Sequence, residues 1–406
     1  MTSLINPGSL AAWCAALLLA STPFSHTVAL RLIVGGLAGV LCIIALVRER
    51  NGVSALPPVW LPFVLWAAWS AASLAWSVEP ERSEKELRNE VIYTGIALWT
   101  CYVAAQMRHA GRILLPVTAA AATLLCALAL YHYMQAGFAG YATGRHGGPG
   151  NLSTALITIL PCAVLAAWYG ARAGWRRAVL WGLAFIGMLL AAAYTTLSRT
   201  VWIAFGVELL VIGAFLASRH QLLAASRGRQ VAAALAIGLV AATAFATLHI
   251  QEQRLAYGGL EISHDQRLML WPEVVQYIEA RPLTGYGFGR GLLRKSLNED
   301  FKNGLLWHAH NIFLDMALQI GWPGVALFVL LLGATLREGW RLARTPVALS
   351  SACGIALLAV LAGMVVRNST DVLLVRQNAL LFWGVVGVLL AWGRQAGELP
   401  RARADA

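Results

Sequence analysis

Apolar residues in this chain come in uninterrupted runs about as long as a membrane is thick, and this pattern limits the possible folds. Hydrophobic residues make up 59% of the 406 positions and charged residues 12%, which is about half the charged share of soluble proteins. A soluble fold would leave part of these runs in water, because no fold hides all of its apolar surface. Most of the chain is therefore expected to be surrounded by lipid.

Windows of about 19 residues predict twelve membrane-spanning helices. The predicted spans are 8–24, 27–47, 56–76, 89–107, 113–134, 151–169, 178–196, 200–217, 230–248, 311–335, 347–366 and 377–393. The first run has neither a basic segment before it nor a small-residue cleavage site, so it is interpreted as a retained helix and not a signal peptide. The predicted fold class is an all-α polytopic membrane protein with about twelve transmembrane helices.

The charges between the predicted spans indicate how the chain crosses the membrane. On one side the connecting segments hold sixteen basic residues, all of them arginine, and only four acidic residues. Short loops rich in basic residues stay in the cytoplasm, so this side and both chain termini are predicted to be cytoplasmic. The net charge of +12 is thereby explained as a topology signal, and nucleic acid is not expected as a partner.

The polar segments on the opposite, extracytoplasmic side are longer and richer in charge. Residues 77–90 are expected to form a short helix at the interface, and residues 137–150 a glycine-rich loop. The longest connection divides the chain into 1–248 with nine predicted spans, 249–310 as a large loop with short helices, and 311–406 with three predicted spans and a short tail. Function is therefore expected on the extracytoplasmic face. The sequence contains neither a Walker loop nor a dinucleotide fingerprint, so ATP-driven work is not expected.

A histidine-asparagine pair, His310 and Asn311, opens the tenth predicted span. Histidine is the side chain best suited to proton transfer near neutral pH. Two other interpretations stay open. The histidine could merely cap the helix, or it could belong to a zinc site with His308 and His264, because three histidine ligands suit zinc.

Two arginines lie where an anion could meet them. Arg199 lies between two predicted spans with almost no loop, where a charge needs an anionic partner or a water-filled cavity unless it snorkels to the interface. Arg267 and Trp271 are one helical turn apart and therefore share a face. Gly285 and Gly287 follow that helix, and spaced glycines let a backbone approach a ligand closely. A nucleotide-binding loop is disfavoured because no strand precedes these glycines, and a tight, glycine-hinged loop over a membrane cavity fits better.

Other charged residues give weaker indications. Lys85 and Arg88 could bind phosphate or an acidic acceptor, or could form ion pairs with the glutamates beside them. Arg145 and His146, in the glycine-rich loop, could line the same cavity. Three further charged residues fall inside predicted spans: Arg31, Glu208 and Asp315. Charge is costly there, and the sequence assigns these three no role beyond buried partners or a cavity wall.

The histidine-asparagine pair is also the start of a motif. His310 and Asn311 are followed after nine residues by Gly321 and after two more by Gly324. This spacing reproduces the H-[NSQ]-x9-G-x-x-G signature of bacterial O-antigen ligases (WaaL), and the chain resembles that family. Arg199 matches another position of the family.

A second segment extends the resemblance. The stretch from Arg267 through Trp271, Pro282, Gly285 and Gly287 is similar to the R…W…P…G-x-G segment in the large periplasmic loop of O-antigen ligases. Topology and motifs together cover nearly the whole chain. The signature is shared by a superfamily that also contains O-antigen polymerases, protein O-oligosaccharyltransferases and proteins assigned to inorganic-carbon transport.

The resemblance implies a fold and a chemistry. O-antigen ligases resemble GT-C-type glycosyltransferases and move a glycan from undecaprenyl diphosphate to a sugar hydroxyl of lipid A–core. By this resemblance Arg199 and Arg267 bind the donor diphosphate, because a guanidinium fork suits phosphate oxygens, and His310 is the catalytic base. Inversion at the anomeric carbon is expected, without a cofactor. No metal is expected, since the extracytoplasmic carboxylates include no Asp-x-Asp pair for a hard cation.

The resemblance also implies a location and a set of partners. The protein is expected in the bacterial inner membrane, in contact with the lipid bilayer, with its active site on the periplasmic face. The donor is undecaprenyl-diphosphate-linked O-antigen, the acceptor is lipid A–core, and the protein is expected to act as a monomer.

Three alternatives remain at this point. An O-antigen polymerase would use the same donor chemistry, so the histidine and the arginines do not separate it from a ligase. Protein O-oligosaccharyltransferases tend to carry a further periplasmic C-terminal portion, whereas this chain ends some 13 residues after its last predicted span. A transporter is expected to contain inverted repeats and helices broken near the middle of the membrane, and neither is evident in the sequence.

Overall fold

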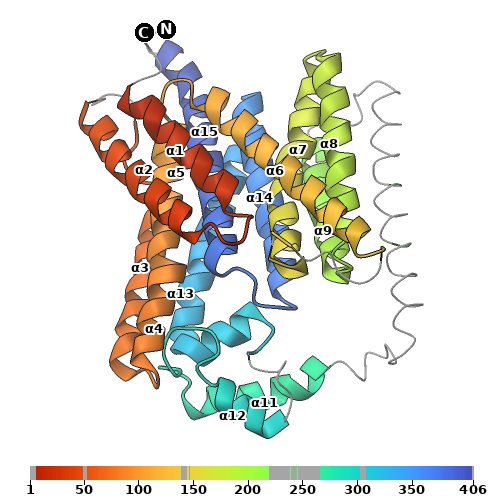
Figure 1. The fold of residues 1–406 in the computed structure, drawn as a ribbon. Helices are drawn as coiled ribbons and strands as arrows, with labels where there is room; N and C mark the ends of the chain where they lie inside the picture. Colours follow the sequence, from red (N-terminus) through yellow and green to blue (C-terminus); the bar gives the residue numbers. More distant parts are fainter. Residues whose placement is uncertain are drawn as a thin grey trace.

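The structure is a computed structural model of the chain. It describes residues 6–48, 53–138, 144–145, 147–218, 238, 245, 266–301 and 308–404, with the backbone alone at 266–268, 298–301 and 399–404. Within these residues every regular element is a helix. The helices stand side by side as an upright bundle, and short helices lie across one end of it (Figure 1).

The described helices share the apolar composition of the predicted spans, apart from a few short polar ones. In chain order they are α1 (Pro7–Ser21), α2 (Val28–Arg48), α3 (Trp60–Ala72), η1 (Ser73–Trp76), α4 (Pro80–Leu87), η2 (Arg88–Ile92), α5 (Tyr93–Ala105), α6 (Ala110–Gln135), α7 (Pro149–Arg172), α8 (Arg176–Tyr194), α9 (Arg199–Ser218), α11 (Gln266–Ala280), α12 (Arg294–Phe301), α13 (Ile312–Ala343), α14 (Ala348–Asn368) and α15 (Arg376–Ala404).

Eight of the described helices are long and apolar enough to cross a membrane, by length and composition: α2, α6, α7, α8, α9, α13, α14 and α15. Shorter apolar helices lie at 7–21 and 60–76. Each predicted span corresponds to one described helix or to two consecutive ones, except 230–248, which lies outside the described residues apart from Gly238 and Phe245. The predicted fold class, an all-α polytopic membrane protein, is confirmed.

Glycines bring the helices together where their backbones cross. A Cβ added to Gly387 of α15 would lie 2.5 Å from the carbonyl oxygen of Leu98 in α5. One added to Gly354 of α14 would lie 2.6 Å from the carbonyl oxygen of Gly339 in α13. Helices in lipid gain little from burying apolar surface against one another, so close approach at small residues contributes much of their packing. The most buried of the candidate spans, α14 and α15, lie in these contacts.

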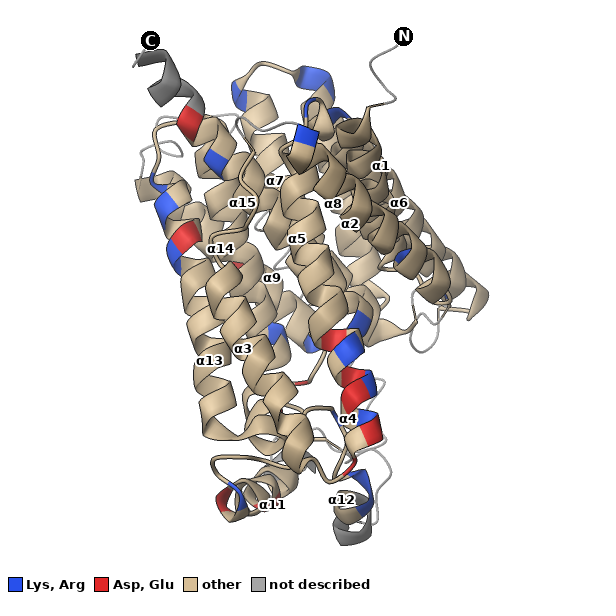
Figure 2. Cartoon of the chain, turned by 90° about the vertical axis from the view of Figure 1, so that its left-hand side faces the viewer, with Lys and Arg blue, Asp and Glu red and all other residues tan. Residues whose placement is uncertain are grey.

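The two ends of the bundle differ in charge. The start of α1 and the end of α15 lie at one end, and α4, α11 and α12 lie at the other (Figure 1). Arginines, with a few acidic residues among them, gather at the first end, whereas acidic and basic residues alternate along α4, the short helix predicted within 77–90, at the second (Figure 2). We call the end with α4, α11 and α12 the site end. Its periplasmic orientation remains a prediction from the arginines.

Candidate active site at the start of helix α13

The start of α13 is held by the side chain of Asn311. Its Oδ1 accepts hydrogen bonds from the backbone N–H groups of Phe313 and Leu314 at 2.9 and 3.2 Å, as a helix N-cap does. Its Nδ2 donates to the carbonyl oxygen of Ser369 at 3.1 Å. Ser369 belongs to the loop 369–375 between α14 and α15, so Asn311 fixes this loop beside the preceding residue, His310.

Two histidines and one aspartate meet at this point. Nε2 of His308 and Nδ1 of His310 each lie 3.3 Å from Oδ1 of Asp371, and the imidazole centroids are 3.8 Å apart. The side chains of His308, His310 and Asp371 are 5%, 20% and 26% exposed. His310 is therefore the histidine that a substrate can reach more easily, and Asp371 is its carboxylate partner.

The backbone of His310 is held in an unfavourable conformation. Its φ of +49° is left-handed, which costs about 1–2 kcal/mol for a residue with a side chain. Such strain persists where the surroundings impose it, and it is frequent at functional sites. On one side the cap by Asn311 imposes it. On the other, the carbonyl oxygen of Ala309 accepts a hydrogen bond from Nε1 of Trp271 at 3.0 Å.

The charge states of the cluster follow from burial and proximity. Burial alone raises the pKa of the Asp371 carboxyl, but the imidazoles of His308 and His310, helped by the N–H of Val372 and by Arg367, outweigh this effect and hold the pKa well below its usual range. Burial lowers the pKa of His308, against the opposing effect of Asp371. At neutral pH the cluster therefore holds a carboxylate beside a neutral His308.

This arrangement can orient His310 for proton transfer. If Nδ1–H of His310 points at Asp371, the lone pair lies on Nε2, and the carboxylate stabilises the imidazolium that forms when a proton is taken. The tautomer is inferred from the contact with Asp371.

The same three side chains could hold a metal ion. His308, His310 and Asp371 place three ligand atoms within 4.8 Å of one another, and three protein ligands suit catalytic zinc. His264, considered as a ligand from the sequence, lies outside the described residues. A metal bound to Nδ1 of His310 would replace the proton there, so the two arrangements exclude each other.

The glycines of the motif join the loop after α11 to a break in α13. The break lies at Gly321, whose φ is +68°. The N–H of Trp322 donates to the carbonyl oxygen of Pro282 at 2.8 Å instead of continuing the helix. The carbonyl oxygen of Leu318, left without that partner, accepts from the N–H of Tyr286 at 3.0 Å. The loop thus replaces the hydrogen bonds that the break removes.

The contact between the loop after α11 and the break in α13, here called the joint, leaves no room for side chains at its glycines. A Cβ on Gly321 would lie 2.5 Å from the carbonyl oxygen of Leu283, and one on Gly285 would lie 2.5 Å from that of Gln319. Gly287 lies against Ser77 in the same way, ahead of α4. The backbone that these glycines approach closely is therefore the protein's own. Gly324 accommodates the side chain of Ile320, one turn before it.

Gly321→Ala is expected to destabilise the protein, because its Cβ would collide with the Leu283 carbonyl and its φ is left-handed. We expect a loss of about 2 kcal/mol or more, measured as a lower thermal unfolding midpoint in detergent. Gly333→Ala is the matched control. Gly333 lies on the same helix, and a Cβ added there would meet nothing within 4 Å. Equal midpoints for the two variants would show that the joint does not need a glycine.

Of the two arginines predicted to bind phosphate, one lies on the bundle helix α9 and the other on α11 at the site end. Arg199 is the first residue of α9 and is partly exposed. The backbone of Arg267 lies in the first turn of α11, one turn before Trp271, and its side chain is among those not described. Trp271 is hydrogen-bonded to Ala309, so α11 lies directly beside the histidine turn.

The secondary candidates for substrate binding differ in their surroundings. Nη1 of Arg88 lies 3.8 Å from Oε1 of Glu84, and both side chains are exposed, which is the kind of ion pair that the sequence also allowed for Arg88. Lys85 is exposed on the same helix. Arg145 is exposed, and its carbonyl oxygen accepts a hydrogen bond from Oγ of Ser25 at 2.8 Å. His146 lies outside the described residues.

Sequence reasoning did not single out Asp371 or the basic residues around it. Nη1 of Arg290 donates to the carbonyl oxygen of Val372 at 2.8 Å. Nη2 of Arg376 lies 2.9 Å from Oε1 of Glu86. Arg367, at the end of α14, helps to lower the pKa of Asp371 through its positive charge. The signal that could have found them is the cluster of charged residues, R-N-S-T-D-V-L-L-V-R, between two apolar spans on the side predicted to be extracytoplasmic.

Two of the charged residues within predicted spans are buried packing partners. Nε of Arg31 donates to the carbonyl oxygen of Thr27 at 3.4 Å. The Glu208 side chain lies directly over Gly363 of α14, which has no Cβ to obstruct it.

A comparison with protein families gives one match. Residues 188–329 match the protein-family model described as O-antigen ligase. The matched segment contains both sequence motifs and extends from before Arg199 to beyond Gly324, whereas Asp371 lies outside it. A comparison with curated proteins gives no match. The motifs, the helical membrane fold and the family match together support membership of the chain in the O-antigen ligase/polymerase superfamily.

Proposed function

We propose that the protein is an O-antigen ligase. It would be an inverting, metal-independent GT-C-type glycosyltransferase that moves O-antigen polysaccharide from undecaprenyl diphosphate to a sugar hydroxyl of lipid A–core. The observation that carries this proposal is the contact of His310 with Asp371 at the site end, beside the helix that bears Arg267. Superfamily membership supports a lipid-linked polysaccharide as substrate.

The proposed reaction needs one base and a stabilised leaving group. The acceptor hydroxyl oxygen attacks the anomeric carbon from the side opposite the diphosphate. As that C–O bond forms, the bond from the anomeric carbon to the diphosphate breaks, and undecaprenyl diphosphate leaves with the electron pair. Nε2 of His310 takes the hydroxyl proton, and Asp371 stabilises the imidazolium. Attack from the opposite side inverts the anomeric configuration.

Arg199 and Arg267 are proposed to bind the departing diphosphate. Negative charge grows on the leaving group in the transition state, and fixed positive groups in a poorly hydrated site stabilise it without reorganising. A guanidinium also forms two parallel hydrogen bonds with phosphate oxygens. Lys85, Arg88 and Arg145 remain secondary candidates for contacts with the donor or with the acidic acceptor.

Arg199→Lys and Arg267→Lys are each expected to lower the transfer rate at least about tenfold, because lysine keeps the charge and loses the fork. The measurement is single-turnover transfer by each purified variant. Arg108→Lys is the control, since Arg108 is exposed in the connection between α5 and α6 at the other end of the bundle. Wild-type rates for lysine at both site positions would rule out bidentate phosphate binding.

The proposed setting is the bacterial inner membrane, with the site end in the periplasm and both termini in the cytoplasm. The donor enters from the outer leaflet, and the protein acts as a monomer. The apolar spans and the superfamily support a multi-pass membrane protein.

An O-antigen polymerase of the same superfamily is the second candidate, because it would use the same donor and the same base. A deletion strain separates the two. A ligase deletion is expected to leave long polymer on undecaprenyl diphosphate while the lipopolysaccharide is bare. Single repeat units attached to the core would instead identify a polymerase.

A further inference from the structure

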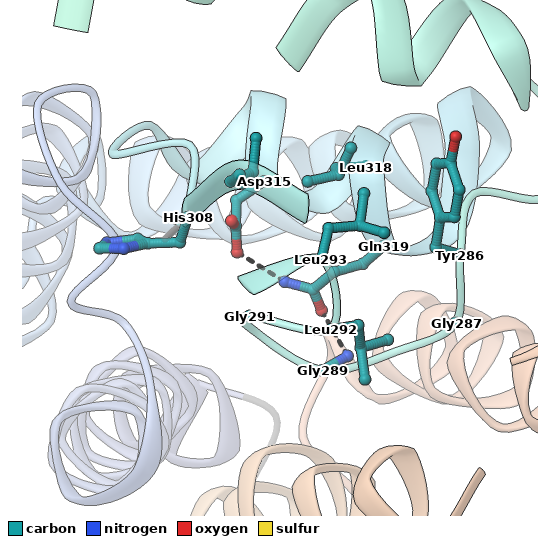
Figure 3. Close-up of a pocket in the computed structure, with 11 residues that line it drawn as sticks. Tyr286, Gly287, Gly289, Gly291, Leu292, Leu293, His308, Asp315, Leu318 and Gln319 are labelled. Carbon is teal, nitrogen blue, oxygen red and sulfur yellow. Dashed lines mark hydrogen bonds between the residues drawn. The ribbon is translucent and has the colours of Figure 1, made fainter. Parts of the chain in front are cut away.

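A buried hydrogen-bond chain connects the glycine loop after α11 to the turn that carries both histidines. Oδ1 of Asp315 accepts from the N–H of Ala309 at 3.2 Å, and Oδ2 of Asp315 accepts from Nε2 of Gln319 at 2.6 Å. Oε1 of Gln319 accepts from the N–H of Gly289 at 2.8 Å. The last two bonds are drawn in Figure 3. Each of these three acceptor oxygens therefore faces a donor.

Both side chains are enclosed. Asp315 is 1% exposed and Gln319 is 7% exposed. Two small cavities adjoin them: one, lined also by His308, measures about 10 Å³ (Figure 3), and the other, lined also by Glu90, about 30 Å³. Neither has room for more than a few water molecules. The pair therefore cannot bind a sugar or a phosphate directly. A buried polar network is costly unless all its members are satisfied, so its presence here calls for a role other than substrate contact.

The position of the network supplies that role. Ala309 lies between the two histidines, and the next residue, His310, has the strained left-handed φ of +49°. Asn311 fixes the turn on its helical side, Trp271 holds the Ala309 carbonyl, and Asp315 holds the Ala309 N–H. Removing the carboxylate contact would leave one of these three restraints unmade and would allow the turn to relax.

We propose that Asp315 and Gln319 are positioning residues for His310. Asp315 fixes the histidine turn, and Gln319 ties it to Gly289, so that the loop joined to α11 and the proposed base move as one unit. This inference rests on the proposed function for its activity measurement and on chemical modification of His310 for a measurement that needs no substrate.

The test exchanges the carboxylate of Asp315 and the amide of Gln319 between the two positions. In Asp315→Asn, the new Nδ2 faces the Nε2 donor of Gln319, and turning the Gln319 amide over would place a donor against the N–H of Gly289. In Gln319→Glu, two carboxylates face each other. The double variant Asp315→Asn/Gln319→Glu can restore every bond, because Asn Nδ2 donates to one Glu oxygen and Gly289 donates to the other, with one buried carboxylate as before.

Each single variant is expected to lose about tenfold in kcat, because it buries an unsatisfied or repelling group, with less than about a twofold change in the donor KM. The double variant is expected to return to within about threefold of wild type. Diethylpyrocarbonate should modify His310 at an altered rate in the single variants and at the wild-type rate in the double variant, as followed by peptide mass spectrometry. Glu208→Gln, which replaces a buried carboxyl group of α9 by an amide, is the control and should change neither measurement.

A double variant as slow as the worse single variant, with an unchanged thermal midpoint, would overturn the proposal. So would single variants that match wild type in both measurements. If a single variant does not fold, recovery of fold and rate in the double variant still tests the exchange. If the wild-type protein transfers no glycan, the proposed function fails, and the modification rates alone decide the positioning proposal.

Discussion

His310→Ala is expected to leave donor binding intact and nearly to abolish transfer. General-base catalysis typically contributes about 10² to 10⁴ in rate, and His310 is the more exposed histidine of the pair in contact with Asp371. The measurement is the transfer rate of purified variant, together with binding of the lipid-linked donor. An unchanged thermal midpoint would show that the loss is chemical and not structural.

His308→Ala is the matched comparison. His308 contacts the same carboxylate oxygen, but its side chain is only 5% exposed, so it supports Asp371 and is less accessible to the acceptor. We expect its loss to be much smaller than that of His310→Ala. If the two histidines were zinc ligands, both variants would lose activity to a similar degree. Full activity for His310→Ala would exclude it as the base.

Asp371→Asn is expected to cost about a hundredfold or more in kcat. An amide facing His310 can donate to Nδ1, which moves the ring proton to Nε2 and removes the lone pair that would accept the hydroxyl proton. It also removes the charge that stabilises the imidazolium. The measurement is kcat with saturating donor and acceptor, alongside a thermal midpoint.

Glu338→Gln makes the same chemical change at the far end of α13, where Glu338 pairs with Arg341 at 2.8 Å. It is expected to keep the wild-type kcat. If Asp371→Asn were equally active, the contact between Asp371 and His310 would have no part in catalysis.

The spans could be predicted from the sequence because the lipid-facing runs are long and apolar. The ends of the helices could be predicted less accurately. Helix α13 continues to Ala343, beyond the predicted 335, because Arg337, Glu338 and Arg341 extend it as a charged final segment that a hydropathy window excludes. Helix α15 likewise runs past the predicted 393.

The motif located the histidine turn in the sequence, whereas the partners of its residues depended on the fold. Asp371 is separated from His310 by two membrane-spanning helices, and no periodicity connects them. The sequence suggested that the spaced glycines approach a ligand, but Gly285 and Gly321 pack a loop into a helix break, which only the three-dimensional contact reveals. Asp315 had no assignable role until its bond to the Ala309 N–H was visible.

Reconstituted transfer tests the central claim most directly. Purified protein is mixed with undecaprenyl-diphosphate-linked O-antigen and lipid A–core, with and without EDTA, and the glycan-bearing lipid A–core is quantified. We expect transfer at the same rate in both conditions for the wild-type protein and nearly none for His310→Ala. Complete inhibition by EDTA, or full transfer by His310→Ala, would contradict a metal-independent mechanism that depends on His310 as its base.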